Sequence, residues 1–133
     1  MPVTYQIDLA NRLIHTQCTG PITVAEVLNH FRLLEQDPSC PDRVDVLLEV
    51  RDGTTVPTSG ELRNVTWEIA RMRGRVQFGI CAIVAPTNVL FGMMRVFKVY
   101  SEDYFRETEV FRDLSEAEAW LASKREGSSP TGT

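Results

Sequence analysis

The sequence predicts an α/β protein whose single-layer sheet is mixed but mostly parallel, with helices packed on it. Two observations carry this prediction. Stretches with the apolar periodicity of strands alternate along the chain with stretches of helical periodicity, and turn or capping residues separate them. The chain has 133 residues, which fits one domain that buries roughly two-thirds of its unfolded surface. We assign residues 1–125 to this domain and residues 126–133, rich in Gly and Ser, to a disordered tail.

A hairpin and a helix open the predicted order. VTYQID, residues 3–8, alternates apolar and polar side chains, and NRLIHTQC, residues 11–18, follows after a short gap. A Gly-Pro pair then breaks the chain. Thr23 and Glu26 have the spacing of a capping box, and the helix that they open covers residues 24–36.

Two apolar strands and a second helix come next. VDVLLEV, residues 44–50, is almost continuously apolar, which is typical of a parallel strand buried on both faces. Thr58 and Glu61 form a second capping box, and apolar residues then repeat at helical spacing up to Gly74. VQFGICAIV, residues 76–84, is the following strand.

The last part of the chain completes the alternation. We expect a helix over about residues 89–104 and a short strand at residues 109–111. Ser115 and Glu118 have the spacing of a third capping box, which opens a helix over residues 116–124. The predicted order is therefore ββαβαβαβα, with an antiparallel hairpin followed by right-handed parallel crossovers.

Composition narrows the classes of function. A formal net charge of −4 does not favour nucleic acid or an anionic membrane as a partner. Cys18, Cys40 and Cys81 are odd in number and far apart, which indicates neither a disulfide framework nor a zinc site and fits a reducing compartment. The N-terminus lacks the features of a signal peptide, and no apolar run approaches the roughly 20 residues that span a bilayer. We expect a cytoplasmic protein without a transmembrane segment.

The predicted order, the Ser59–Gly60 step at the start of the second helix and the ending VFRDLSEAEAWL together resemble the SpoIIAA-like branch of STAS-type domains. The resemblance covers about residues 5–121. In the anti-sigma-factor antagonists of that superfamily, an Asp-Ser-Ser/Thr-Gly turn carries the residue that a partner kinase phosphorylates. That turn corresponds here to Pro57, Thr58, Ser59 and Gly60, so Pro57 replaces the aspartate and Thr58 takes the acceptor position. The resemblance implies non-enzymatic binding or regulation.

Physical reasoning allows two interpretations of the same turn. Thr58 is fully accounted for as a helix cap, but a helix N-terminus also stabilises a bound or covalent phosphate. If the strands before them are parallel neighbours, the turns at Thr58, Ser59 and Gly60 and at Thr87 and Asn88 meet at the carboxyl edge of the sheet. A small anion-binding site at this edge is the functional alternative to two ordinary caps.

No motif indicates catalysis, a metal site or a cofactor. His15 and His30 each lack a second ligand three or four residues away, and we expect them at the surface or its boundary. No serine, cysteine or acid has the context of an activated nucleophile. Asp52 and Asp113 follow strands at the ligand-binding edge, where most such residues only form turns.

An interface on the second and third helices is the remaining expectation. The apolar residues of the second helix leave Trp67 outside its buried face, between two arginines. The third helix has more apolar surface than a one-sided helix needs. The expected interface residues are Arg63, Trp67, Arg71, Val89, Met94 and Phe105.

Three classes of function follow. The leading hypothesis is a non-catalytic STAS-like interaction or regulatory module, homodimeric, that binds a protein partner or a small ligand. The second is a carrier of an apolar or amphipathic small molecule, and the third is an unrecognised enzyme. The first two differ in what covers the surplus apolar surface of the third helix: another chain, or the walls of a cavity.

Overall fold

The computed structural model describes residues 2–127 and has an α/β architecture with one mostly parallel sheet. The predicted α/β class is therefore confirmed. The strands are β1 (Val3–Asp8), β2 (Leu13–Cys18), β3 (Arg43–Val50), β4 (Gln77–Val84) and β5 (Glu107–Phe111). The helices are α1 (Val24–Gln36), α2 (Ser59–Arg71), α3 (Asn88–Tyr100) and α4 (Leu114–Gly127), and a short 3₁₀ helix, η1 (Met72–Gly74), follows α2.

The five strands lie in the order in which they occur in the chain. β1 pairs with β2 in antiparallel fashion, and β2, β3, β4 and β5 are then parallel to one another. Each parallel connection carries a helix, as parallel neighbours require. The carboxyl ends of β2 to β5 consequently meet at one edge of the sheet and their amino ends at the other.

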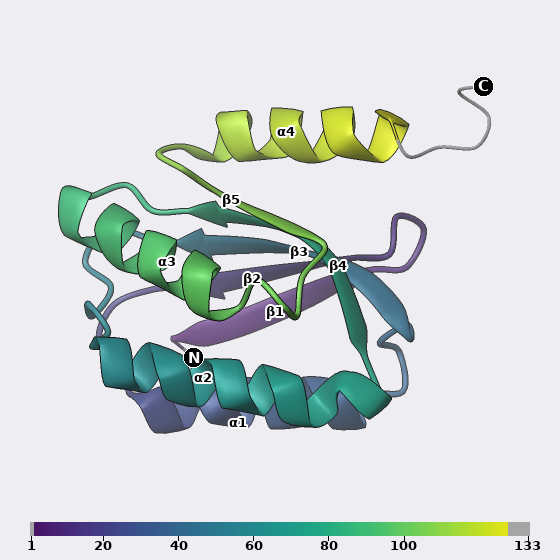
Figure 1. Ribbon diagram of the computed structural model, residues 1–133, viewed down its shortest axis with the longest axis horizontal. Helices are drawn as coiled ribbons and strands as arrows, with labels where there is room; N and C mark the ends of the chain where they lie inside the picture. Colours follow the sequence, from purple (N-terminus) through teal and green to yellow (C-terminus); the bar gives the residue numbers. More distant parts are fainter. Residues whose placement is uncertain (1, 128–133) are drawn as a thin grey trace.

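The helices cover the two faces of the sheet unequally (Figure 1). α1, α2 and α3 pack on one face, where the largest apolar cluster joins α2 and α3 to residues of β3, β4 and β5. α4 alone packs on the other face, where Ala117 and Leu121 contact apolar residues of β3 and β4. The alternation of the opening hairpin reflects this arrangement, because Tyr5 and Ile7 pack under α1 while Thr4 and Gln6 are exposed.

A bulge interrupts the pairing of the central strands β3 and β4. Val44 pairs with Phe78, but Val46 pairs with Cys81, so β4 contains one extra residue in this stretch. The Asp45 carboxylate accepts a hydrogen bond of 2.9 Å from the backbone N–H of Ile80. It occupies the space into which a side chain at Gly79 would project, which explains the glycine at this position.

Several helix and strand ends differ from expectation. α3 ends at Tyr100, four residues before the predicted end, and Ser101 is its C-cap. The Ser101 backbone N–H and hydroxyl both donate to the Phe97 carbonyl, and a turn closed by the Tyr104 N–H on the Ser101 carbonyl follows. β5 begins at Glu107, two residues before the predicted strand. The expected Ser115–Glu118 capping box does not form: Asp113 accepts the backbone N–H of Glu116 at 2.9 Å instead.

The domain boundary also shifts slightly. α4 extends to Gly127, so the predicted tail starts inside this helix. Residues 128–133, the rest of the predicted tail, lie outside the described residues.

Candidate functional site

An apolar cavity of about 150 Å³ lies between the sheet and the three helices on its first face. Strands β2, β3 and β4 form one wall, and α1, α2 and α3 form the other. Leu48 of β3, Cys81 of β4, Val27 of α1, Leu62 of α2 and Met94 of α3 are among its lining residues. We call this space the apolar cavity.

The burial of the central strand shows that the cavity is a real gap in the packing. Val46 and Leu48 point toward the helices from β3, in the middle of the sheet, yet both are only half-buried. A core packed to ordinary density would bury such side chains completely. Both residues line the apolar cavity, so their exposed surface faces this internal space.

The cavity reaches the surface at the carboxyl edge of the sheet. Thr23, the cap of α1, and Thr55, in the segment between β3 and α2, line the cavity and are exposed. Cys18 and Val50, the last residues of β2 and β3, line it at the same edge. The opening therefore lies beside the N-termini of α1 and α2, where ligands bind in many open α/β sheets.

His30 is the main polar group of the interior wall. It lines the cavity from α1 and is 6% exposed, so the expected surface or boundary position is wrong. Its Nε2 lies 3.4 Å from the Thr16 hydroxyl, and its Nδ1 has no hydrogen-bond partner among residues 2–127. Burial lowers the pKa of His30 from 6.5 to about 4, so the ring is neutral at physiological pH.

Two cysteines, Cys18 and Cys81, also line the cavity. Burial raises the pKa of Cys18 to about 11 and raises the pKa of Cys81 still further. Both thiols are therefore protonated near neutral pH. In this state they act as small apolar wall groups, because the thiolate and not the thiol is the nucleophile.

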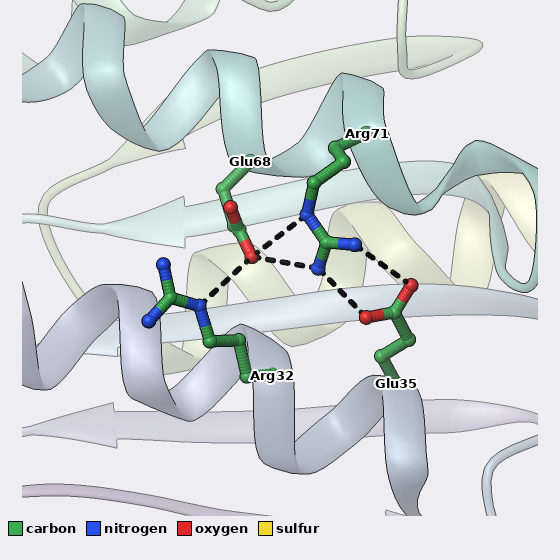
Figure 2. A network of polar contacts seen from close by, with 4 residues as sticks. All are labelled: Arg32, Glu35, Glu68 and Arg71. Atoms are coloured by element: carbon green, nitrogen blue, oxygen red, sulfur yellow. Dashed lines mark hydrogen bonds and ion pairs between the residues drawn. The ribbon is translucent and has the colours of Figure 1, made fainter.

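An ion-pair network joins α1 to α2 at the ends remote from the opening (Figure 2). Arg71 of α2 donates to both carboxylate oxygens of Glu35 of α1, with Nη2 at 2.7 Å from Oε1. The same guanidinium donates to Glu68 Oε1 from Nη2 at 2.8 Å and from Nε at 3.2 Å. Arg32 Nε lies 3.5 Å from that oxygen. We call these four residues the α1–α2 clamp; it fixes the spacing of the two helices that form one wall of the cavity.

Charges in the clamp reinforce one another. Hydrogen bonds from Arg71 hold the pKa of Glu68 below its usual value, and those same bonds raise the pKa of Arg71. Glu68 is 8% exposed, so its carboxylate needs these partners. Arg71 is one of the predicted interface residues, but its guanidinium binds Glu35 and Glu68 of the same chain.

The turn predicted from the capping pattern is a helix cap. Glu61 N–H donates to Thr58 Oγ1 at 3.1 Å, and Thr58 N–H donates to Glu61 Oε1 at 2.9 Å, which completes the capping box. Thr87 caps α3 through its hydroxyl alone, which accepts the Leu90 N–H at 3.3 Å, without the reciprocal bond of a capping box. Asn88 accepts a hydrogen bond of 2.8 Å from Arg112.

The two capped turns do not form one crevice in the apolar cavity. β3 and β4 are parallel neighbours, as the anion-site hypothesis required. However, the residues that line the cavity near these turns are Pro57, Glu61 and Leu90, and not the five predicted ones. The predicted residues Thr58, Ser59, Gly60, Thr87 and Asn88 remain at the carboxyl edge, outside the cavity.

The predicted interface residues divide into two groups. Trp67 and Val89 are 65% and 60% exposed, so both point outward as expected. Arg63 lies over the Tyr100 ring, 5.1 Å from its centroid, and donates to the Tyr100 hydroxyl at 3.3 Å. It therefore links α2 to α3 within the chain.

Met94 and Phe105 require a correction. They are 5% and 8% exposed and belong to the main apolar cluster, so they cannot contact a partner. Both also line the apolar cavity. The surplus apolar surface of α3 exists because the helix contacts the sheet, α2 and the cavity together, and a single periodic stripe does not cover all three.

Sequence reasoning missed the polar end of the site, although a signal was present. His30 follows Val27 by three residues and precedes Leu34 by four, which places it on the buried side of α1. Thr16 lies two residues after Ile14, on the inward side of β2. The helix of residues 24–36 and the strand before it thus each place one polar residue at an inward position. This pattern could have indicated the polar end of the cavity.

The two strand-end aspartates differ in role. Asp113 caps α4, and the hydrogen bond from the Glu116 backbone holds its pKa below the usual value. Asp52 is exposed in the turn that follows β3, next to Gly53, whose φ of 88° favours glycine. Neither aspartate lines the apolar cavity.

Comparison of the chain with protein-family models, curated proteins and solved structures gives no significant match. Within the described part of the chain, no helix is long and apolar enough to cross a membrane. Residues 2–127 also contain no group of three or more His, Cys, Asp or Glu side chains placed to hold a metal ion. The three cysteines are free thiols.

Proposed function

We propose that the protein is a non-catalytic binding module that takes a small apolar molecule into the apolar cavity. The observation that carries this proposal is the cavity itself, whose wall includes Met94 of α3 and Phe105, which follows α3. Of the two expected destinations for that surface, another chain or a cavity, Met94 and Phe105 favour the cavity. The carrier hypothesis is therefore better supported than the interaction-module hypothesis.

The dimensions and chemistry of the cavity restrict the ligand. A volume of about 150 Å³ corresponds to a molecule of about the size of benzene, or to one end of a longer molecule that extends through the opening. Glu61 is the charged residue in the lining, and His30 is neutral near pH 7. The Glu61 carboxylate already accepts the Thr58 N–H in the α2 capping box, and the other lining residues are uncharged near neutral pH, so a buried charged ligand would lack a dedicated partner. The ligand class is thus a neutral aromatic or branched aliphatic compound.

One hydrogen-bonding group on the ligand would improve the fit. The unpartnered Nδ1 of His30 belongs to a buried wall residue, and the Thr16 hydroxyl lies beside the other ring nitrogen. A buried polar atom without a partner is costly, so a hydroxyl or carbonyl that bonds to it is favoured over a hydrocarbon of the same shape. Phenol-like compounds combine this group with the required size.

Relation to STAS-type domains remains part of the proposal. The mostly parallel sheet and the helix cap at Thr58 are compatible with a SpoIIAA-like module. Under this hypothesis, a partner protein binds the turn at Thr58, Ser59 and Gly60. A ligand in the cavity, which opens next to the α2 N-terminus, changes the affinity of that partner for the turn. Phosphorylation of Thr58 would convert the cap hydroxyl into a charged group at the positive end of the helix dipole.

A second candidate function is protein interaction through α2, and one observation favours it. Trp67 of α2 is 65% exposed, and tryptophans are frequent energetic centres of interfaces. Arg63, one turn away, is held in place by Tyr100. A homodimer through this surface is compatible with ligand binding, because Trp67 does not line the cavity.

Native mass spectrometry, followed by thermal unfolding with benzene, phenol and indole, tests the proposal. A ligand that binds only the folded state raises its stability by about 2.7 kcal/mol at a concentration of 100 times Kd. We expect phenol to raise the unfolding temperature more than benzene does. Native spectra report any copurified ligand and the number of subunits together.

Two variants make the test specific. Leu48→Trp fills the cavity from β3, whereas Leu33→Trp adds the same ring at a position on α1 that is 46% exposed. We expect Leu48→Trp to lose the ligand-induced shift and Leu33→Trp to keep it. Absence of a shift with every compound, or an equal shift in both variants, would contradict ligand binding in the cavity.

Catalysis is the outcome that would most change this proposal. A broad panel of hydrolase, transferase and redox substrates should give no turnover, because the residues that line the cavity include no activated nucleophile. Turnover that Asp52→Asn or Asp113→Asn abolishes, with the fold retained, would establish an enzyme instead.

A further inference from the structure

A second, chemically opposite site lies at the amino edge of the sheet. It is an open groove of about 630 Å³. Its lining residues include Arg12, Arg43, Arg106, Arg125, Asp45 and Gln77. We call it the arginine groove. Four of the fourteen basic residues of this acidic protein border it, and one carboxylate, that of Asp45, faces them.

The topology explains why these arginines converge. Arg12 directly precedes β2, Arg43 is the first residue of β3, and Arg106 directly precedes β5. Because β2 to β5 are parallel, their amino ends lie at one edge of the sheet. Positions that are about 30 or 60 residues apart in the chain therefore come together in space, which no local motif reveals.

The fourth arginine reaches the same edge from the other direction. Arg125 lies in the last turn of α4, and its guanidinium Nε is 3.6 Å from the Asp45 carboxylate. It also donates to the backbone carbonyl of Asn11. Asp45 is itself held by the Ile80 N–H at the β3–β4 bulge. The floor of the groove is thus ordered by bonds between β3, β4, α4 and the β1–β2 turn.

The other three arginines are not used in this way. Within residues 2–127, the side chains of Arg12, Arg43 and Arg106 make no hydrogen bond or ion pair, and all three residues are exposed. Arg12 also has a φ of 50°, in the left-handed region that favours glycine or asparagine. Guanidinium groups gathered at one edge repel one another, and a bound anion removes that repulsion.

We propose that the arginine groove binds a small molecule carrying two or more phosphate or carboxylate groups. The planar guanidinium donates paired hydrogen bonds that match both anions, and clustered arginines select for multiple charges. A volume of about 630 Å³ is within the range of small-molecule sites. The groove lies at the amino edge, whereas the apolar cavity opens at the carboxyl edge, so the two ligands would enter from opposite edges of the sheet.

Titration calorimetry of the whole chain with tripolyphosphate and with citrate tests this site. Arg43→Gln/Arg106→Gln removes two charges from the groove, and Arg73→Gln/Arg95→Gln removes two exposed charges elsewhere. We expect the groove variant to raise Kd about tenfold or more, because it loses charge-assisted hydrogen bonds to the anion. The control should change Kd less than about twofold, because its two arginines lie outside the groove. Binding should weaken with added salt. Thermal unfolding verifies that both variants fold.

The same titrations separate free anions from other sources of the same chemistry. Vesicles containing a phosphoinositide and a short single-stranded DNA serve as the comparison ligands. The proposal is overturned if neither free anion binds at low salt, if both double variants lose binding equally, or if only vesicles or DNA bind. Selective loss of tripolyphosphate or citrate binding in the groove variant supports it.

Discussion

At the scale of single residues, His30 shows how an apolar environment determines the state of a polar group. Tyr5 and Phe31 contact its ring edge to face, with centroids 5.3 Å and 5.1 Å away, and Thr16 is its polar neighbour. None of these groups stabilises a positive charge as a carboxylate would. Desolvation therefore dominates and keeps the imidazole neutral.

The neutral state of His30 makes stability depend on pH. Its pKa is about 4 in the folded protein against an ordinary value of 6.5, so the unfolded chain takes up the proton first. The contribution is complete above about pH 6.5 and is lost as the pH falls toward 4, by up to about 3 kcal/mol. Urea unfolding at several pH values should show that His30→Phe loses less unfolding free energy between about pH 6.5 and about pH 4 than the wild type does. Parallel pH profiles of the two proteins would contradict this assignment.

Thr58 tests a single cap. Its hydroxyl accepts the Glu61 N–H, so Thr58→Ala should lower the free energy of unfolding by roughly 0.5 to 2 kcal/mol. Thr58→Asp should be tolerated, since aspartate caps well and suits the positive end of the helix. Ser59→Ala, at the next exposed position, is the control for denaturant unfolding. If Thr58→Asp keeps stability but abolishes assembly or partner binding, the turn is a switch and not only a cap.

At the scale of helices and strands, local signals in the sequence predicted most of the structure. The alternating pattern of residues 3–8 predicted the first strand. The capping boxes at Thr23 and Thr58 predicted where α1 and α2 begin, because a helix start depends on residues close together in the chain. The start of α4 was wrong because Asp113 and Ser115 both have capping side chains with a glutamate three residues later. Local chemistry permits either, and the direction in which the chain leaves β5 decides between them.

α4 gives a prediction at this scale, because it alone covers its face of the sheet in the described part of the chain. Leu121 is 4% exposed and packs with Ile80, Ala82 and Val84. Leu121→Ala should lower the free energy of unfolding by about 2 to 5 kcal/mol through lost burial and a new cavity. Leu33→Ala removes the same atoms at an exposed position of α1 and should cost less than about 0.5 kcal/mol. Equal losses in chemical denaturation would show that α4 does not pack as described.

At the scale of the whole molecule, both candidate sites depend on contacts between distant segments. The apolar cavity lies between the sheet and α1, α2 and α3, whereas periodicity only states which side of each helix is buried. The arginine groove requires the parallel order of four strands. The sequence therefore led to a candidate ligand site at the carboxyl edge, which stays a prediction, but indicated neither the apolar cavity nor the arginine groove.

The association state is the last property of the whole molecule to test. Trp67 is 65% exposed on α2, and a homodimer that buries it should dissociate when the ring is removed. Trp67→Ala should therefore sediment as a monomer at concentrations where the wild type is dimeric. Leu9→Ala, at a position 61% exposed in the β1–β2 turn, removes apolar surface elsewhere and should leave the dimer intact. Met94→Glu is unsuitable, since Met94 is buried and the charge would disrupt the core. A wild type that stays monomeric at high concentration would rule the dimer out and leave Trp67 as an unpartnered surface residue, which folded proteins tolerate because apolar atoms form much of every protein surface.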